Sequence, residues 1–180
     1  MNETFELNSK NKEYNTWRLF QIVFIVSLIN DIFDKSVNRD QCELLHVMTG
    51  GGKSEAYFGI VIFTSFYDRL IGKCFGVSAI TKFPLRMLSV QQLQRIANLF
   101  IFAEEIRLKE NIKGEPFSIA YFVGSQEEEF PSYNFNIIKK IKKAQSKDSN
   151  IKGKIIDTCP ICGGEVVLDV DEPKQLVIHK

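Results

Sequence analysis

The residues best suited to chemistry form one short stretch, Thr49-Gly50-Gly51-Gly52-Lys53-Ser54. An apolar run ends just before it, and a helix-like stretch starts just after it. Glycines let backbone N–H groups wrap an anion, and the N-terminus of the following helix adds positive dipole. Lys53 would reach the β- and γ-phosphates, and the Ser54 hydroxyl would hold Mg²⁺. The pattern predicts a nucleoside triphosphate–Mg²⁺ site made of Thr49, Gly50, Gly51, Gly52, Lys53, Ser54 and Glu55, with Lys53 and Ser54 as the catalytic groups.

This loop is a short variant of the usual phosphate-binding pattern, because Val47 stands where the first glycine normally lies. The alternative is a glycine turn between a strand and a helix that happens to be followed by Lys-Ser. Three glycines, a lysine and a serine at a strand-to-helix junction favour nucleotide binding over that alternative.

Two further segments narrow the function that the loop could serve, one through the base of the nucleotide and one through a nucleic acid. Gln21, in Arg18-Leu19-Phe20-Gln21, carries a donor and an acceptor on one amide and could pair with an adenine edge. In the segment Pro84 to Gln91, Arg86 could pair with a phosphodiester, and helix-start N–H groups could bind another phosphate. The alternatives are an ordinary helix start and an ordinary loop with a solvated arginine.

Cys159 and Cys162 have the spacing of a zinc knuckle, but one Cys-x-x-Cys supplies half of a tetrahedral Zn²⁺ site. His179 is the only downstream candidate for a further ligand. Redox pairing is the alternative, although no thioredoxin-like pattern surrounds the pair. Cys42 and Cys74 are expected to be isolated thiols.

The pattern of apolar residues predicts an α/β fold. Helices are expected over 17–35, 54–70 and 89–109, and strands over 43–48, 75–81 and 117–123. Helical crossovers of this length imply a parallel sheet covered on both faces. The predicted organisation is a flexible N-terminus (1–16), a partial ATP-binding domain (17–125), a charged linker (126–154) and a zinc-ribbon-like half (155–180).

The apolar run that ends at Asp171-Glu172 has two possible interpretations. It resembles a Walker B strand, whose acidic residues hold Mg²⁺. It also fits one arm of a hairpin that turns at Asp171-Glu172-Pro173-Lys174. The cysteine pair directly before it and Pro173 directly after it favour the hairpin.

Length and composition limit the class of protein and the kinds of partner that these predictions can involve. With 180 residues, 44% hydrophobic and 25% charged, the chain suits one soluble globular domain with a small appendage. A net charge of +1 neither favours nor excludes nucleic acid. The N-terminus is not a secretory signal, and the longest apolar run is too short to span a bilayer. A cytoplasmic protein without membrane contact is expected.

Together, Arg-x-Phe-Gln, Thr-Gly-Gly-Gly-Lys-Ser and Pro-x-Arg-x-Leu-x-x-Gln resemble the Q motif, motif I and motif Ia of superfamily 2 helicases, over roughly residues 17–124. The resemblance implies a RecA-like first motor domain. In it, Arg18 and Gln21 would lie at the adenine, and Pro84, Arg86 and Gln91 would contact nucleic acid, DNA more than RNA.

The sequence around these motifs resembles that of the large helicases of bacterial anti-phage systems. The similar segments are HVMTGGGKSEAYFGI, KFPLRMLSVQQLQR, IAYFVG and a later Cys-Pro-x-Cys-Gly. The DISARM helicase is the nearest, followed by the Druantia helicase. The resemblance implies a cysteine-rich insertion after the third strand and other defence subunits as partners. It also implies a piece of a larger motor that hydrolyses little ATP alone. The alternatives are a stand-alone nucleotide- or nucleic-acid-binding module and a small P-loop kinase, which the third motif argues against.

Overall fold

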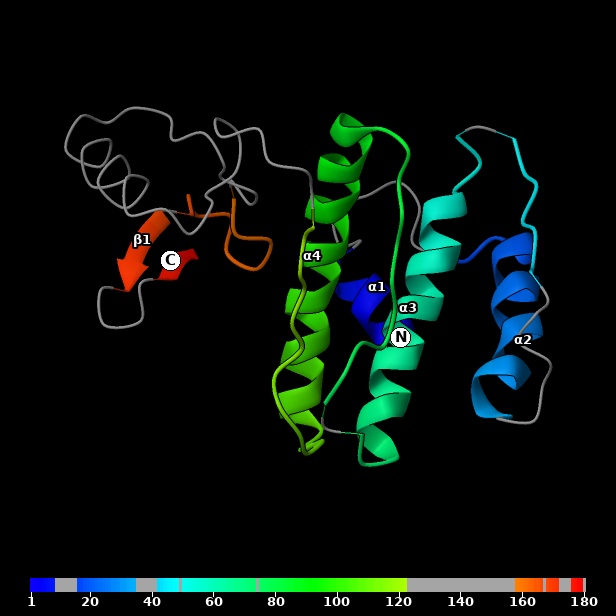
Figure 1. Cartoon of the computed structure of the whole chain (residues 1–180), viewed down its shortest axis with the longest axis horizontal. Helices are drawn as coiled ribbons and strands as arrows, with labels where there is room; N and C mark the ends of the chain where they lie inside the picture. Colours follow the sequence, from blue (N-terminus) through cyan, green and yellow to red (C-terminus); the bar gives the residue numbers. More distant parts are fainter. Residues whose placement is uncertain are drawn as a thin grey trace. The chain divides into compact units, whose positions relative to one another are not determined.

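The structure, a computed structural model, describes residues 1–8, 16–34, 42–48, 50–73, 75–122, 158–166, 168–171 and 176–179. The elements in this part of the chain are α1 (Asn2–Asn8), α2 (Leu19–Phe33), α3 (Lys53–Leu70), α4 (Arg86–Lys109), β1 (Leu168–Asp171) and β2 (Leu176–His179) (Figure 1). The chain divides into two compact units. Unit 1 is Met1–Pro84 with Asn98–Ser118, and unit 2 is Leu85–Ala97 with Ile119–Lys180.

The predicted α/β fold with a parallel sheet is wrong. None of the described residues in the three expected strands, 43–48, 75–81 and 117–123, lies in a strand. Strands of a parallel sheet need backbone partners and cover on both faces. The apolar side chains meant to supply that burial are instead exposed, Leu44 by 88%, Phe75 by 83% and Ile80 by 87%. The described structure is therefore mostly helical, and a RecA-like sheet is not its fold.

The helices follow the sequence pattern more closely. Helix α3 occupies the predicted 54–70 segment and starts one residue earlier, and Gly72 follows it with φ of +79°. Helix α4 starts three residues before the predicted position and ends at Lys109 as predicted. Helix α2 begins and ends two residues inside the predicted 17–35 span. These segments have helical periodicity strong enough to fix their identity without a sheet.

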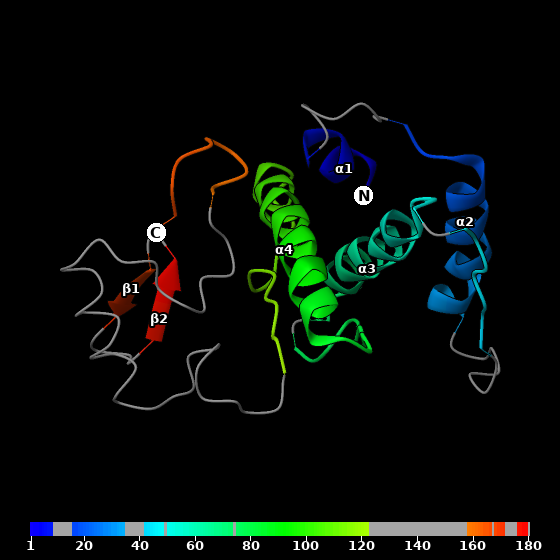
Figure 2. The same cartoon turned by 90° about the horizontal axis from the view of Figure 1, so that it is seen from above.

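Unit 1 has a small core between its helices. Side chains with under a tenth of their surface exposed come from α2, α3 and the second half of α4, namely Ile25, Ala56, Phe58, Ile62, Leu99, Phe102, Ala103 and Ile106. Helix α2 packs on α3 (Figure 2). A Cβ added to Gly59 of α3 would lie 2.9 Å from Ile25 Cδ1, so the glycine permits this close approach. Burial at about 25 cal/mol per Å² of apolar surface makes this core the main stabilising element of the unit.

Helix α2 is rich in apolar residues but buries few of them. Only Gln21 and Ile25 are buried. Leu19, Val23 and Val26 expose 59% or more of their surface. An apolar composition shows that a helix can be buried, but the number of neighbouring elements decides how many faces are covered.

The N-terminal segment, expected to be loose, contains α1. Thr4 is buried, and the Phe5 ring centroid lies 4.6 Å from that of Trp17. The aromatic contact holds the short helix against the start of α2. The 126–154 linker lies outside the described residues.

Strands β1 and β2 pair antiparallel, with Leu168 opposite His179 and Asp171 opposite Leu176. This pairing confirms the predicted hairpin, and it is not the parallel arrangement that the Walker B interpretation needs. Among the described residues, no helix is both long and apolar enough to cross a membrane.

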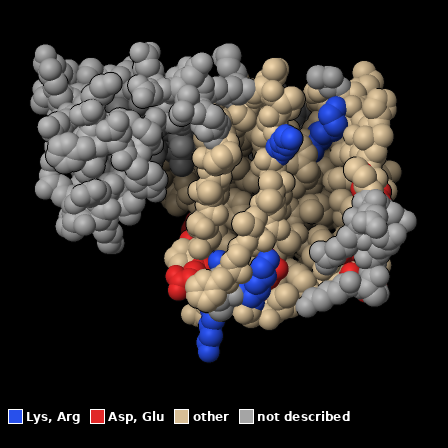
Figure 3. Space-filling model, viewed as in Figure 1, with Lys and Arg blue, Asp and Glu red and all other residues tan. Residues whose placement is uncertain are grey.

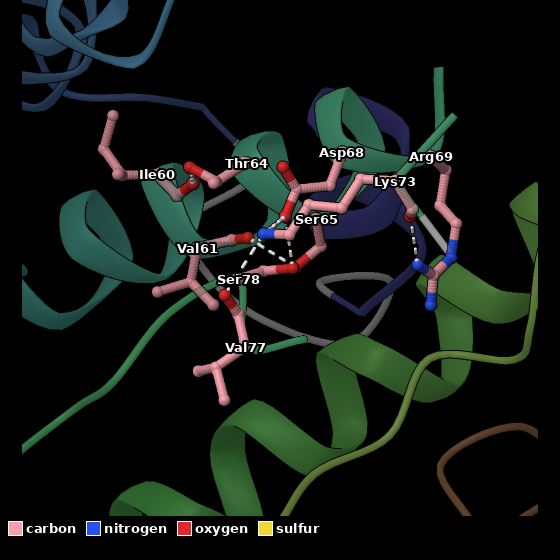
Figure 4. Close-up of polar contacts among 9 residues, drawn as sticks. All are labelled: Ile60, Val61, Thr64, Ser65, Asp68, Arg69, Lys73, Val77 and Ser78. Atoms are coloured by element: carbon pink, nitrogen blue, oxygen red, sulfur yellow. Dashed lines mark hydrogen bonds and ion pairs between the residues drawn. The ribbon is translucent and has the colours of Figure 1, made fainter. Parts of the chain in front are cut away.

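Two polar clusters fix the loops of unit 1. In the first, the buried Asp68 of α3 accepts hydrogen bonds at Oδ2 from Lys73 Nζ and Ser78 Oγ, both at 2.6 Å (Figure 4). Lys73 Nζ also donates to the Val77 carbonyl at 3.2 Å, and Arg69 Nη1 donates to the Lys73 carbonyl at 2.9 Å. The carboxylate therefore ties the end of α3 to the segment that follows it.

In the second cluster, Arg107 of α4 binds Glu104 through two contacts, at 2.5 and 2.7 Å. The same guanidinium donates to the carbonyls of Ile112 at 2.7 Å and Gly114 at 3.2 Å. Glu104 in turn accepts from the Phe117 N–H at 3.2 Å. The hydrogen bonds from Arg107 lower the pKa of Glu104 below its usual value.

Replacing Asp68 with alanine is expected to cost about 2 kcal/mol of unfolding free energy, because two donors, one of them charged, lose a shared acceptor. Ser78→Ala removes one neutral hydrogen bond and should cost about 1 kcal/mol. Urea denaturation of the two variants and the wild type measures both values. Equal costs for the two substitutions would contradict the central role of Asp68.

Glu104→Gln should make unfolding less dependent on pH. Because folding lowers the pKa of Glu104, its ionised form stabilises the fold above the unfolded value of about 4.5, and this contribution is lost as pH falls through the folded pKa. The free energy of unfolding of the wild type should exceed that of the variant by about 1 kcal/mol at pH 7, and the difference should shrink as pH falls through the folded pKa of Glu104. Urea denaturation at pH 7, 5, 4 and 3 measures the difference, with the exposed Glu105→Gln as control. A difference that stays constant with pH would refute this assignment.

Candidate nucleotide-binding site

The glycine loop adopts a backbone that only glycine takes without strain at two of its positions. Gly50 has φ of +78° and Gly52 has φ of +91°. Between them, the Gly51 N–H donates to the Met48 carbonyl at 3.1 Å and closes a tight turn. Helix α3 begins directly afterwards at Lys53. The predicted turn-to-helix junction is therefore present, while Thr49 lies outside the described residues.

The start of α2 holds this loop through two side chains that lie more than thirty positions earlier in the chain. Arg18 Nη1 donates to the Gly51 carbonyl at 2.7 Å. Gln21 Nε2 donates to the Gly52 carbonyl, also at 2.7 Å. Gln21 Oε1 accepts from the Arg18 N–H at 2.8 Å, which caps the first turn of α2. The structure thus brings together the segments of Arg18 and Gly50–Ser54 that the sequence assigned to one site.

These contacts determine where the N–H groups of the loop point. In a planar trans peptide, the carbonyl of one residue and the N–H of the next point in opposite directions. Since the carbonyls of Gly51 and Gly52 point at α2, the N–H groups of Gly52 and Lys53 point away from it. Two successive N–H groups at a helix N-terminus form a concavity that suits an anion.

Lys53 folds back over the loop. Its ammonium group donates to the carbonyl of Val47 and, at 3.2 Å, to that of Met48. The Lys53 side chain thereby bridges the loop, and these two carbonyls were not anticipated from the sequence. Ser54 and Glu55 follow in the first turn of α3, both half-buried. A phosphate group could replace the carbonyls as the partner of Lys53, because a charged acceptor binds an ammonium more strongly than a neutral one does.

The residues predicted to contact nucleic acid lie just before α4 and in its first turns. Pro84 is exposed at the end of its segment in unit 1. Arg86 starts α4, but its side chain lies outside the described residues. Gln91 is exposed on the same helix. A contact that the sequence did not reveal joins Ser89 Oγ to the Tyr121 hydroxyl at 2.5 Å.

The cysteine pair forms a tight knuckle. The Gly163 N–H donates to the Cys159 carbonyl, and the Cys159 N–H donates to the Gly164 carbonyl, both at 2.9 Å. Hydrogen bonds from the backbone of Cys162 and Ile161 lower the pKa of Cys159 and favour the thiolate that a metal needs. In the described part of the chain, no group of three or more His, Cys, Asp or Glu side chains could hold a metal ion. The two thiols of the knuckle have the spacing of half of a tetrahedral Zn²⁺ site.

Gly52→Ala is expected to destabilise the chain more than Gly50→Ala. Both substitutions place a side chain at positive φ, which costs about 1–2 kcal/mol. Only at Gly52 would the new Cβ also lie 2.8 Å from Gln21 Nε2, whereas nothing lies within 4 Å at Gly50. Urea denaturation measures the two costs, and the NMR signals of the Gln21 side-chain amide should shift in Gly52→Ala alone. Equal costs and an unmoved amide would show that Gln21 does not lie on Gly52.

The chain is similar to a known protein. No protein-family model matches the chain, and no solved structure does. The chain is 32% identical over 182 residues to the DISARM protein DrmA of Bacillus paralicheniformis (strain ATCC 9945a / NCIMB 11709 / CD-2). The matched region covers 90% of this chain and 16% of the length of that relative. The similarity supports the DISARM part of the resemblance, without specifying a superfamily 2 helicase domain. Over nearly its whole length, the chain is thus similar to one segment of a DISARM protein.

Proposed function

We propose that this chain binds a nucleoside triphosphate with Mg²⁺ through the glycine loop, as part of an anti-phage defence protein. The observation that carries the proposal is the loop itself. Two glycines at positive φ and the start of α3 present N–H groups to one side, next to Lys53 and Ser54. Lys53 would neutralise phosphate charge, and Ser54 would supply a hydroxyl ligand to Mg²⁺.

The defence context rests on the similarity to DrmA, whereas a role in an ATP-driven motor rests only on the motif resemblance to superfamily 2 helicases. Nucleotide hydrolysis by such a motor needs an acidic group for Mg²⁺ and water and a positive charge at the transition state. We assign neither to a residue of this chain, so the proposed activity of the chain alone is nucleotide binding. A stand-alone binding module is the second candidate, since the loop geometry does not depend on a motor.

Nucleic-acid binding through Pro84, Arg86 and Gln91 is a separate proposal that rests on the motif resemblance. Figure 3 shows the Lys and Arg side chains of the described residues as a few separate groups on the face in view. Binding of the DNA backbone would use local contacts and helix-start N–H groups. Cys159 and Cys162 are proposed as two thiolate ligands of a Zn²⁺ ion.

Lys53→Ala tests the nucleotide proposal. Removal of the ammonium group should weaken binding of ATP with Mg²⁺ by roughly 10- to 100-fold, because hydrogen bonds to charged groups contribute about 1.5–3 kcal/mol. Isothermal titration calorimetry on the whole chain measures the affinity. Thermal denaturation without ligand verifies that the variant folds.

Lys113→Ala is the matched control, because Lys113 is an exposed lysine in unit 1 outside the loop. It should bind as the wild type does. Equal affinity in the wild type and Lys53→Ala would refute the loop as the binding site. The absence of binding to a folded wild type would refute the proposed function.

A further inference from the structure

We infer that Gln21 is a positioning residue that sets the phosphate affinity of the glycine loop, and that the site therefore selects the triphosphate with little regard to the base. The inference rests on the proposed nucleotide binding and specifies its ligand class. It departs from the expectation that Gln21 reads adenine.

The first observation is that both ends of the Gln21 amide are engaged by this chain. Its Nε2 donates to the Gly52 carbonyl, and its Oε1 accepts from the Arg18 N–H. The residue exposes only 5% of its surface. Pairing with adenine requires a donor and an acceptor presented together at an accessible edge. To read a base, Gln21 would have to release the loop and uncap α2.

The second observation is the fit of the loop around this amide. A Cβ at Gly52 would lie 2.8 Å from Gln21 Nε2, so the absence of a side chain at Gly52 allows the contact. The positive φ of Gly52 directs its carbonyl toward α2. Because the next N–H points the opposite way, the contact from Gln21 presents the Lys53 N–H to the anion. Arg18 acts likewise on the preceding peptide through the Gly51 carbonyl.

Gln21 would therefore affect the binding of the phosphates and not the recognition of the base. Every contact of Gln21 described here is to main chain, and its effect passes through N–H groups that recognise negative charge. Groups held in advance in the binding geometry lower the cost of ordering on binding. Loss of the Gln21 contact should therefore weaken every triphosphate by the same factor, whatever base it carries.

The test compares three ligands with Mg²⁺: ATP, GTP and inorganic tripolyphosphate. In the wild type, ATP and GTP should bind within about threefold of each other, and tripolyphosphate should bind measurably. Gln21→Met keeps the side-chain volume and removes both hydrogen bonds. It should weaken all three ligands by a common factor of about five, the equivalent of one net hydrogen bond. Ile22→Met, at the exposed neighbouring position, should change none of them.

Gln21→Asn provides a second variant if Gln21→Met fails to fold. It keeps a buried amide but is one methylene shorter, so it should lose the Gly52 contact and again weaken all three ligands equally. Hydrogen exchange of the Gly51 N–H, which donates to the Met48 carbonyl, should also accelerate in either variant as the loop loosens. A general loss of stability would instead accelerate exchange throughout the protein.

Two outcomes would overturn the inference while leaving the proposed function intact. A loss confined to ATP would make Gln21 an adenine reader. Unchanged affinity for all three ligands would limit Gln21 to capping α2. If the folded wild type binds none of the three ligands, the proposed function fails and the inference fails with it.

Discussion

The contact between the start of α2 and the glycine loop is the constraint on which the candidate site depends. A loop of three consecutive glycines has many accessible conformations, and ordering it costs more entropy than ordering any other residues. Here, side chains of Arg18 and Gln21 fix two successive carbonyls. Helix α2 can do this only because it lies close to α3, where Gly59 makes room for Ile25. The packing of two helices thus determines the backbone of a loop at their ends.

The sequence-based predictions that succeeded concern features set by local signals. Helical periodicity fixed α3 and α4 to within a few residues, and glycines, lysine and serine located a loop at a helix start. These signals are local, since a helix satisfies its own hydrogen bonds and a glycine at positive φ is recognisable by type. The hairpin of β1 and β2 was likewise visible from its turn residues.

The prediction of a parallel sheet failed because a strand cannot form from local interactions alone. Apolar, β-branched segments such as 75–81 have strand composition, but a strand forms only where another backbone accepts and donates along its edge. The contact of Gln21 with the glycine loop was hidden for a related reason. Its type indicated an amide that could pair with a base, yet the partner that it meets, the Gly52 carbonyl, is a main-chain group that no side-chain pattern displays. Asp68 was missed for a different reason, because its side-chain partners Lys73 and Ser78 come together only once the segment after α3 folds back without forming the predicted strand.

In the loop after α4, two arginines from different helices restrict the residue types that the loop accepts. The restriction applies to one position and not to its neighbour. Arg107 recognises residues 112 and 114 only through their carbonyls, which every amino acid carries. At Gly114, however, a Cβ would lie 2.7 Å from Arg69 Cδ, and φ is +119°. Homologous chains that retain both arginines should therefore retain glycine at residue 114, whereas the carbonyl contact at residue 112 sets no requirement on its side chain. Steric exclusion of a Cβ, and not the chemistry of a side chain, would cause glycine to be retained at this position.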